Sequence, residues 1–187
     1  MDDVDDFARQ FRETQERATE LVGPLSHAQF NWRPTTQAWS IAECLDHLNV
    51  TAKAVVAKMK PVIADGRARG VTGQGPFTYG WFSRWFEAEM EPPPRRRTKT
   101  PAVFSVSTNS NHDKDAMLGA YRATGDAWLA VLQSARGLDL KRVKTTSPVS
   151  RLMRFPLGAY FRVSTAHERR HLWQAEQVRT APGFPDA

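Results

Sequence analysis

Residues 167–174 have the sequence His-Glu-Arg-Arg-His-Leu-Trp-Gln, which fits the H-E-x-x-H pattern of zinc proteases letter for letter. Four residues of helix place His167 and His171 one turn and about 40° apart, so both rings can reach one metal ion. In a protease, Glu168 would be the base that acts beside the zinc ion. The pattern therefore has three interpretations: a protease zinc helix, a different metal site, or two histidines that share a helix face by chance.

A metal ion needs at least one more protein ligand, and zinc proteases take it from a residue downstream of this motif. Only sixteen residues follow His171, and the candidates among them are Glu176, Asp186 and the C-terminal carboxylate. Glu176 is expected on the same helix, so we expect the third ligand from elsewhere, and His47 is the best remaining histidine. Cys44, about one helical turn before His47, could be a fourth ligand, although a small buried filler is the commoner role for such a cysteine.

The remaining polar candidates have ordinary explanations as well. His27 lies in a helix-start motif and His112 follows a polar run, so both are expected at the surface. Gln174, about one turn beyond His171, could orient a ligand or a bound water, or could be a polar core residue. Three arginines are expected on the same helix: Arg162, Arg169 and Arg170. We expect them on its solvated face, although they could instead guide anionic substrates to the site.

Four segments have the three-and-four spacing of apolar residues that predicts amphipathic helices. They span residues 4–21, 40–65, 113–135 and 157–180, each about 20 residues or ~30 Å long. Ser40, followed three residues later by Glu43, forms a capping box at the start of the second segment. Four amphipathic helices of similar length predict an all-α four-helix bundle, and 187 residues suit a single domain, residues 1–187.

The connection over residues 66–112 is long enough to contain structure of its own. Residues 79–90 fit a short amphipathic helix that packs on the bundle as a lid, or that forms an aromatic wall for a ligand. Its aromatic residues are Trp81, Phe82, Trp85 and Phe86. Ser26 and Gln29 form a second capping box and predict another short helix. No segment has convincing strand alternation, and residues 102–110 come nearest.

Charge and composition narrow the classes of partner. The net charge is +6, but the one basic cluster, Arg95–Arg97, is bracketed by prolines and fits an exposed loop, so nucleic acid is not expected as a partner. No apolar run approaches the ~20 residues that span a bilayer. A single cysteine excludes an intrachain disulfide, and the acidic start "MDDVDDF" is not typical of a secretory signal. We therefore expect a cytoplasmic protein without a membrane anchor.

Two of these motifs also carry a family resemblance. The segment "WSIAECLDHL", which contains His47, closely resembles the first motif of the DinB-like (DinB/YfiT) superfamily, and "HERRHLWQAEQVR" resembles the second. The segments "LSHAQFNWRP" and "EPPPRRRTKTPAVF" are also similar to that family. The motifs are short, but their order and spacing are fairly specific, and the resemblance spans nearly the whole chain.

The resemblance implies an up-down-down-up four-helix bundle, often a homodimer, with a divalent metal ion held by three histidines. Carried over to this sequence, the metal ligands are His47, His167 and His171, in agreement with the interpretation from the residues alone. Members of the family include thiol transferases that use bacillithiol, mycothiol or glutathione, and a mycothiol-dependent isomerase. The family resemblance implies that the match to the protease pattern is incidental. Glu168 is then expected at the surface or behind the ligands.

Three neutral imidazoles leave a coordination position open, which is typical of catalytic sites. Imidazole suits several transition metals, of which zinc or nickel is expected here. The ion could deprotonate a low-molecular-weight thiol for attack on an electrophilic small-molecule substrate, or lower the pKa of a water for hydrolysis. The alternative from another class is a non-catalytic metal- or ligand-binding stress protein. The sequence assigns no catalytic residue and no thiol-binding residue.

Overall fold

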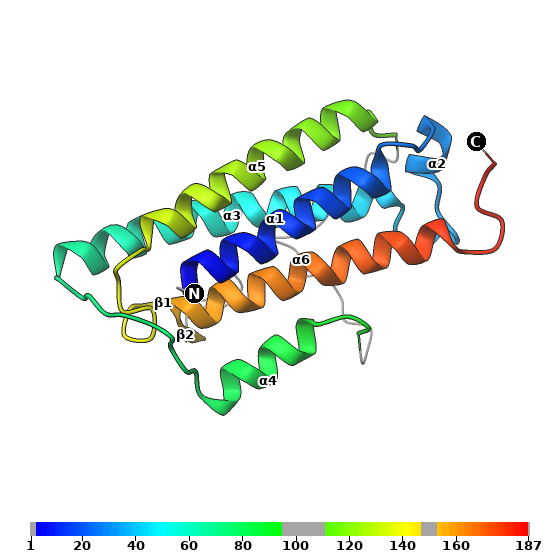
Figure 1. Ribbon diagram of the computed structural model, residues 1–187. Helices are drawn as coiled ribbons and strands as arrows, with labels where there is room; N and C mark the ends of the chain where they lie inside the picture. Colours follow the sequence, from blue (N-terminus) through cyan, green and yellow to red (C-terminus); the bar gives the residue numbers. More distant parts are fainter. Residues whose placement is uncertain (1–2, 95–110, 147–152, 187) are drawn as a thin grey trace.

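The computed structural model describes residues 3–94, 111–146 and 153–186, which form a bundle of four long helices with smaller elements around it (Figure 1). The long helices are α1 (Asp3–Val22), α3 (Ile41–Ala68), α5 (Lys114–Ser134) and α6 (Leu157–Arg179). The smaller elements are α2 (His27–Asn31), α4 (Trp81–Met90), β1 (Lys144–Thr146) and β2 (Arg154–Pro156). The predicted all-α bundle is confirmed, and each long helix begins and ends within three residues of its predicted bounds.

The helices α1 and α6 run in one direction and α3 and α5 in the other, which confirms the up-down-down-up order (Figure 1). Contacts at the helix ends fix these directions: Arg17 late in α1 pairs with Glu176 late in α6, and Arg67 late in α3 donates to the carbonyl of Ser134 at the end of α5. Because α3 and α5 are parallel, the chain must return along the whole bundle between them. This return explains the length of the connection between the two helices.

Reciprocal capping boxes mark the start of two of the helices. At the start of α3, the Ser40 hydroxyl accepts a hydrogen bond from the backbone N–H of Glu43, and the Glu43 carboxylate accepts one from the N–H of Ser40. The same reciprocal pair joins Ser26 and Gln29 at the start of α2. Each pair satisfies backbone donors that a helix leaves free at its first turn. Both predicted capping boxes are confirmed.

Buried apolar side chains form two clusters, one toward each end of the bundle. The first lies where α1 and α6 begin and α3 ends, and includes Phe7 and Phe161, whose ring centroids are 5.9 Å apart. The second lies where α1 and α6 end and α3 begins, and includes Leu45 and Leu172. Within the described residues, no helix is long and apolar enough to cross a bilayer.

The structure contains one motif that the sequence did not predict, a two-stranded antiparallel hairpin of β1 and β2. Thr145 pairs with Phe155, and both side chains are buried. Strands of three residues are too short for an alternating pattern to be recognised. The segment that came nearest to a strand pattern, residues 102–110, lies outside the described part of the chain.

The predicted helix in the long connection is α4, which packs against α6 (Figure 1). Two of its aromatic rings, Phe82 and Phe86, lie against Phe155, with centroids 5.8 and 5.4 Å from that ring. Trp81 is 74% exposed and Trp85 46%, and Phe82 itself remains 39% exposed although its ring contacts Phe155. The prediction that all four aromatic side chains pack on the bundle is therefore wrong for the two tryptophans, because the helix can turn only one face toward α6.

Candidate metal centre

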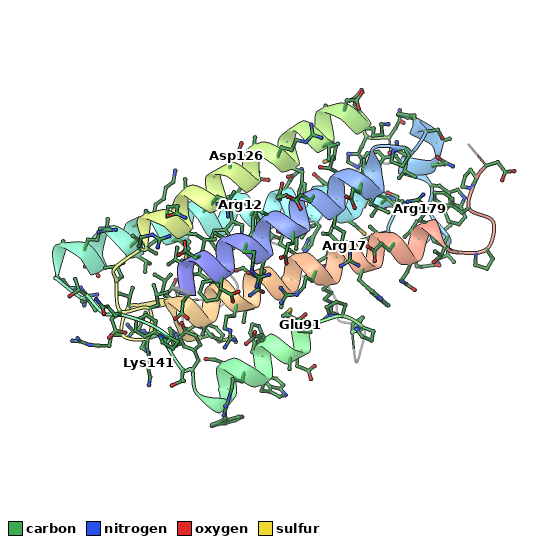
Figure 2. All side chains as sticks on the ribbon, viewed as in Figure 1. Arg12, Arg17, Glu91, Asp126, Lys141 and Arg179 are labelled. Atoms are coloured by element: carbon green, nitrogen blue, oxygen red, sulfur yellow. The ribbon has the colours of Figure 1, made fainter. Side chains whose placement is uncertain are left out.

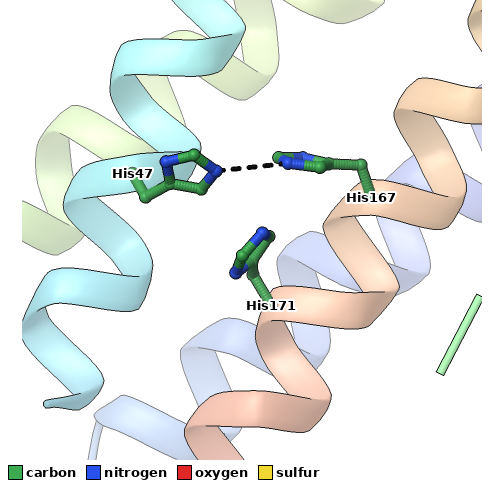
Figure 3. Close-up of side chains that lie close together, drawn as sticks. All are labelled: His47, His167 and His171. Atoms are coloured by element: carbon green, nitrogen blue, oxygen red, sulfur yellow. Dashed lines mark hydrogen bonds between the residues drawn. The ribbon is translucent and has the colours of Figure 1, made fainter. Parts of the chain in front are cut away.

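His47 lies in the second turn of α3, and the start of that helix is anchored from two sides. Arg33, in the preceding loop, donates from Nε to the Glu43 carboxylate at 2.8 Å. Glu43 is buried, so it needs this guanidinium as well as the backbone donors of the capping box. The His47 ring is buried and directed toward α6 (Figure 3). His47 lies on the flank of α3 that packs on α6.

The rings of His47, His167 and His171 converge between α3 and α6 (Figure 3). The Nε2 atoms of His47 and His167 are 3.2 Å apart. The ring centroid of His171 lies 4.4 Å from that of His47 and 4.5 Å from that of His167. Each ring offers one nitrogen, and these three atoms all lie within 4.8 Å of one another. The structure thus brings together the three predicted ligands from two helices.

This spacing fits the donor set of a transition-metal ion. Tetrahedral bonds of ~2.0–2.1 Å place two nitrogen ligands about 3.3 Å apart, and the distance of 3.2 Å between His47 and His167 is close to that value. The same distance also fits a hydrogen bond between two neutral rings, drawn as a dashed line in Figure 3. Among the described residues, no carboxylate or thiol lies close enough to join the three nitrogens.

The surroundings favour the neutral imidazole, which is the form that binds metal. Burial, together with the neighbouring His47 and Arg170, lowers the pKa of His167 to about 3. Burial likewise lowers the pKa of His171 well below its usual value, with the two other histidines and Arg170 acting in the same direction. Both rings therefore keep a lone pair available at neutral pH.

Two further side chains hold the ligand rings. Gln174 Oε1 lies 3.1 Å from Nδ1 of His171, and because an amide oxygen only accepts, Nδ1 must carry the proton and Nε2 the lone pair. Trp39 stacks on His171 at 5.7 Å between ring centroids and contacts His47 at 5.1 Å. The sequence suggested a role for Gln174 but none for Trp39, which lies just before the Ser40 cap and begins the motif "WSIAECLDHL".

Glu168 does not face the histidines. Its Oε2 accepts a hydrogen bond of 2.7 Å from the Tyr121 hydroxyl on α5, and the carboxyl is buried. Burial raises the pKa of Glu168 to about 8, even though the hydrogen bond from Tyr121 acts in the opposite direction. Of the two positions expected for Glu168, at the surface or behind the ligands, the surface position is wrong. The geometry also differs from that of a zinc protease, in which this residue would act beside the ion.

Other candidates from the sequence lie elsewhere. Cys44 is fully buried in the apolar cluster at the start of α3, so it is the expected buried filler, and burial raises the pKa of its thiol. Glu176 lies on α6 as expected and pairs with Arg17. His27 is exposed, but the expectation of a surface position is wrong for His112, which is 7% exposed. The backbone of His112 is held by the side-chain amide of Asn31, a contact over 81 residues that the sequence did not reveal.

The three arginines of α6 were expected on a solvated helix face, but they are only partly exposed and contact α4 or the residue that follows it. Arg169 donates from Nε to Glu91 at 3.0 Å, and Arg170 donates to the carbonyl of Glu89 at 2.8 Å. Arg162 lies 3.4 Å from the Glu87 carboxylate. Figure 2 shows Glu91 where α4 ends beside α6. Arg95–Arg97 lie outside the described residues.

Comparison with known proteins agrees with this architecture. The family model of the DinB superfamily matches residues 10–175. Among solved structures, YfiT from Bacillus subtilis, described as a probable metal-dependent hydrolase with an unusual four-helix bundle topology, is similar with a TM-score of 0.64. The two chains are 13% identical, the similarity covers 97% of this chain and 89% of YfiT, and at this identity it concerns the fold alone. No curated protein matches the sequence. Because the family model covers most of its length, the chain belongs to the DinB superfamily.

Proposed function

We propose that this protein is a metal-dependent enzyme that transfers a low-molecular-weight thiol to an electrophilic small-molecule substrate. The convergence of His47, His167 and His171 is the observation that carries the proposal. These three rings would hold a divalent ion, zinc or nickel, through one nitrogen each. When bound, such an ion lowers the pKa of a thiol or water at its open position.

The residues around the histidines favour a thiol over a water as the nucleophile. Hydrolysis at an H-E-x-x-H zinc site uses the glutamate as a general base, but Glu168 is turned toward Tyr121. Within the described residues no other carboxylate joins the three nitrogens. A thiol needs no such base, because the charge of an ion is sufficient to deprotonate it. This difference in chemistry supports thiol transfer.

Hydrolysis is the second candidate, and the likeness to YfiT favours it, because that protein is described as a probable metal-dependent hydrolase. A non-catalytic metal-binding role is the third. The homodimer implied by the family stays a prediction, which light scattering on the purified protein would test.

The first test is the metal content of untagged protein from metal-supplemented medium. We expect about one transition-metal ion per chain in the wild type and none in His47→Ala. His112→Ala is the matched control, because it also removes a buried histidine but one outside the three-ring group. Retention of the ion by His47→Ala, or its loss from both variants, would contradict the proposed ligand set.

The second test separates the three candidate functions. The metal-loaded protein is incubated with monochlorobimane and one of several thiols, and in parallel with activated esters. Metal-dependent conjugation that His47→Ala abolishes supports thiol transfer. Ester hydrolysis without conjugation supports the hydrolase, and a stable metal complex without either activity supports the binding protein.

A further inference from the structure

A hydroxyl in the middle of a helix ordinarily donates to the carbonyl three or four residues before it, because no other acceptor is as near. Six hydroxyls of the long helices do so: Thr14, Thr19, Thr124, Ser134, Ser164 and Thr165. Thr51 on α3 differs from them. Its Oγ1 is buried and has no hydrogen-bond partner, and it is the one helical serine or threonine in the described residues of which this is true.

Thr51 shares a face of α3 with His47, one member of the three-histidine group. It follows His47 by one turn of α3 and is about 40° further around the axis, which places it between His47 and the buried residues Leu48 and Val55. Side chains on a helix lean toward its N-terminus, so the Thr51 side chain lies over the turn that carries His47. This is the face of α3 from which His47 reaches His167 on α6.

A buried hydroxyl without a partner is destabilising, and native proteins seldom keep one without a use for it. The carbonyl that Thr51 does not use is that of His47, a proposed ligand. The free O–H is a single donor, which suits a small anion with an available lone pair. Within residues 3–94, 111–146 and 153–186, the other three buried side-chain nitrogen or oxygen atoms without a partner are on Gln15, Tyr79 and His112, none of which belongs to the three-histidine group.

We propose that the Thr51 hydroxyl donates a hydrogen bond to the small anionic ligand, such as a thiolate, that occupies the open side of the three-histidine centre. The inference rests on the proposed metal-dependent function and names a residue that would contact the reacting ligand. In the ligand-free protein the hydroxyl stays unpaired, and the ligand supplies the missing acceptor. Thr51 therefore contributes to the affinity for the ligand and not to that for the metal.

The test uses the full chain loaded with Co²⁺ and titrated with azide, a small anion whose binding changes the visible absorption of cobalt. Four proteins are compared: the wild type, Thr51→Val, Thr51→Ser and Thr165→Val. Valine has the shape of threonine without the hydroxyl, and serine keeps the hydroxyl. Thr165→Val is the matched control, because it removes a buried hydroxyl that already donates to the carbonyl of Phe161.

All four proteins are expected to bind about one Co²⁺ per chain. Thr51→Val should bind azide about tenfold more weakly, the effect of losing one hydrogen bond to a charged group. Thr51→Ser and Thr165→Val should bind azide as the wild type does. Repeating the titration with 2-mercaptoethanol should give the same order of affinities.

Three results would overturn the inference. If Thr51→Val holds cobalt and binds azide as tightly as the wild type, the hydroxyl does not contact the ligand and the metal centre itself is unaffected. If Thr51→Val loses cobalt, or Thr165→Val weakens azide equally, the hydroxyl acts through packing. If the wild type binds no cobalt, the proposed function fails and this inference fails with it.

Discussion

The buried carboxyl of Glu168 makes the pH dependence of stability a direct test of the site geometry. Burial raises its pKa from the ordinary value of 4.5 to about 8 in the folded protein. Between these two values the unfolded chain releases a proton that the folded chain retains. The free energy of unfolding must then fall as the pH rises, and the loss is complete once the pH exceeds the folded pKa.

The substitution Glu168→Gln removes this proton and keeps an oxygen that can accept the hydrogen bond from Tyr121. The unfolding free energy of the wild type, measured relative to the variant, should fall by up to about 1.4 kcal/mol per pH unit between pH 5 and 8. Above pH 8 the difference should level off. Other groups, His167 and His171 among them, are present in both proteins, so their contributions cancel in the difference.

Urea unfolding of both metal-free proteins at one-unit steps from pH 5 to 9 would measure this difference. The metal content of the two proteins should be equal, because Glu168 faces away from the histidines. A difference that does not change with pH would show that Glu168 is ionised in the folded state. Loss of metal from Glu168→Gln would instead indicate that Glu168 acts beside the ion, as the glutamate of a zinc protease does.

Three further outcomes are expected. Gln174→Leu should weaken metal binding about 10–100-fold, as measured by competition with a chelator, because His171 loses the acceptor that orients it, whereas Gln174→Glu keeps an acceptor and should bind normally. Arg33→Ala leaves the buried carboxylate of Glu43 without its guanidinium and should lower the unfolding free energy, measured in urea, by roughly 1–3 kcal/mol. An unchanged unfolding free energy would show that Glu43 does not need Arg33. Arg169→Ala removes the ion pair with Glu91 at the end of α4, so limited proteolysis at low salt should cut that helix faster than in the wild type. The difference in cleavage rate should become smaller at high salt, which screens the ion pair.

The helices and the three histidines were predictable because their signals are local. The apolar spacing repeats every three or four residues, and caps such as Ser40 with Glu43 lie within one turn. His167 and His171 are likewise one turn apart. His47 was predicted to join them because it was the best remaining histidine and because the family resemblance implied it. The three rings do converge in the structure, and their role as metal ligands stays a prediction.

The features that could not be predicted depend on contacts between distant residues. The partner of Glu168 is Tyr121, 47 residues away, and nothing near either residue indicates the pair. His112 appeared exposed because its neighbours are polar, yet Asn31 holds it from across the chain. The exposure of Trp81 depends on which face of α4 meets α6, and an aromatic segment does not specify that face.

The separation of the candidate ligands along the chain has a consequence for folding. His47 and His167 are 120 residues apart, so bringing them together in a flexible chain would cost about 4 kcal/mol of loop-closure entropy. Folding of the bundle already brings these residues together before any ion binds. The unfolded chain offers an ion only the local pair His167 and His171. An ion held by all three rings would thus act as a reversible cross-link between the second and last long helices. Chelation would then lower the stability of the whole bundle, not of one loop.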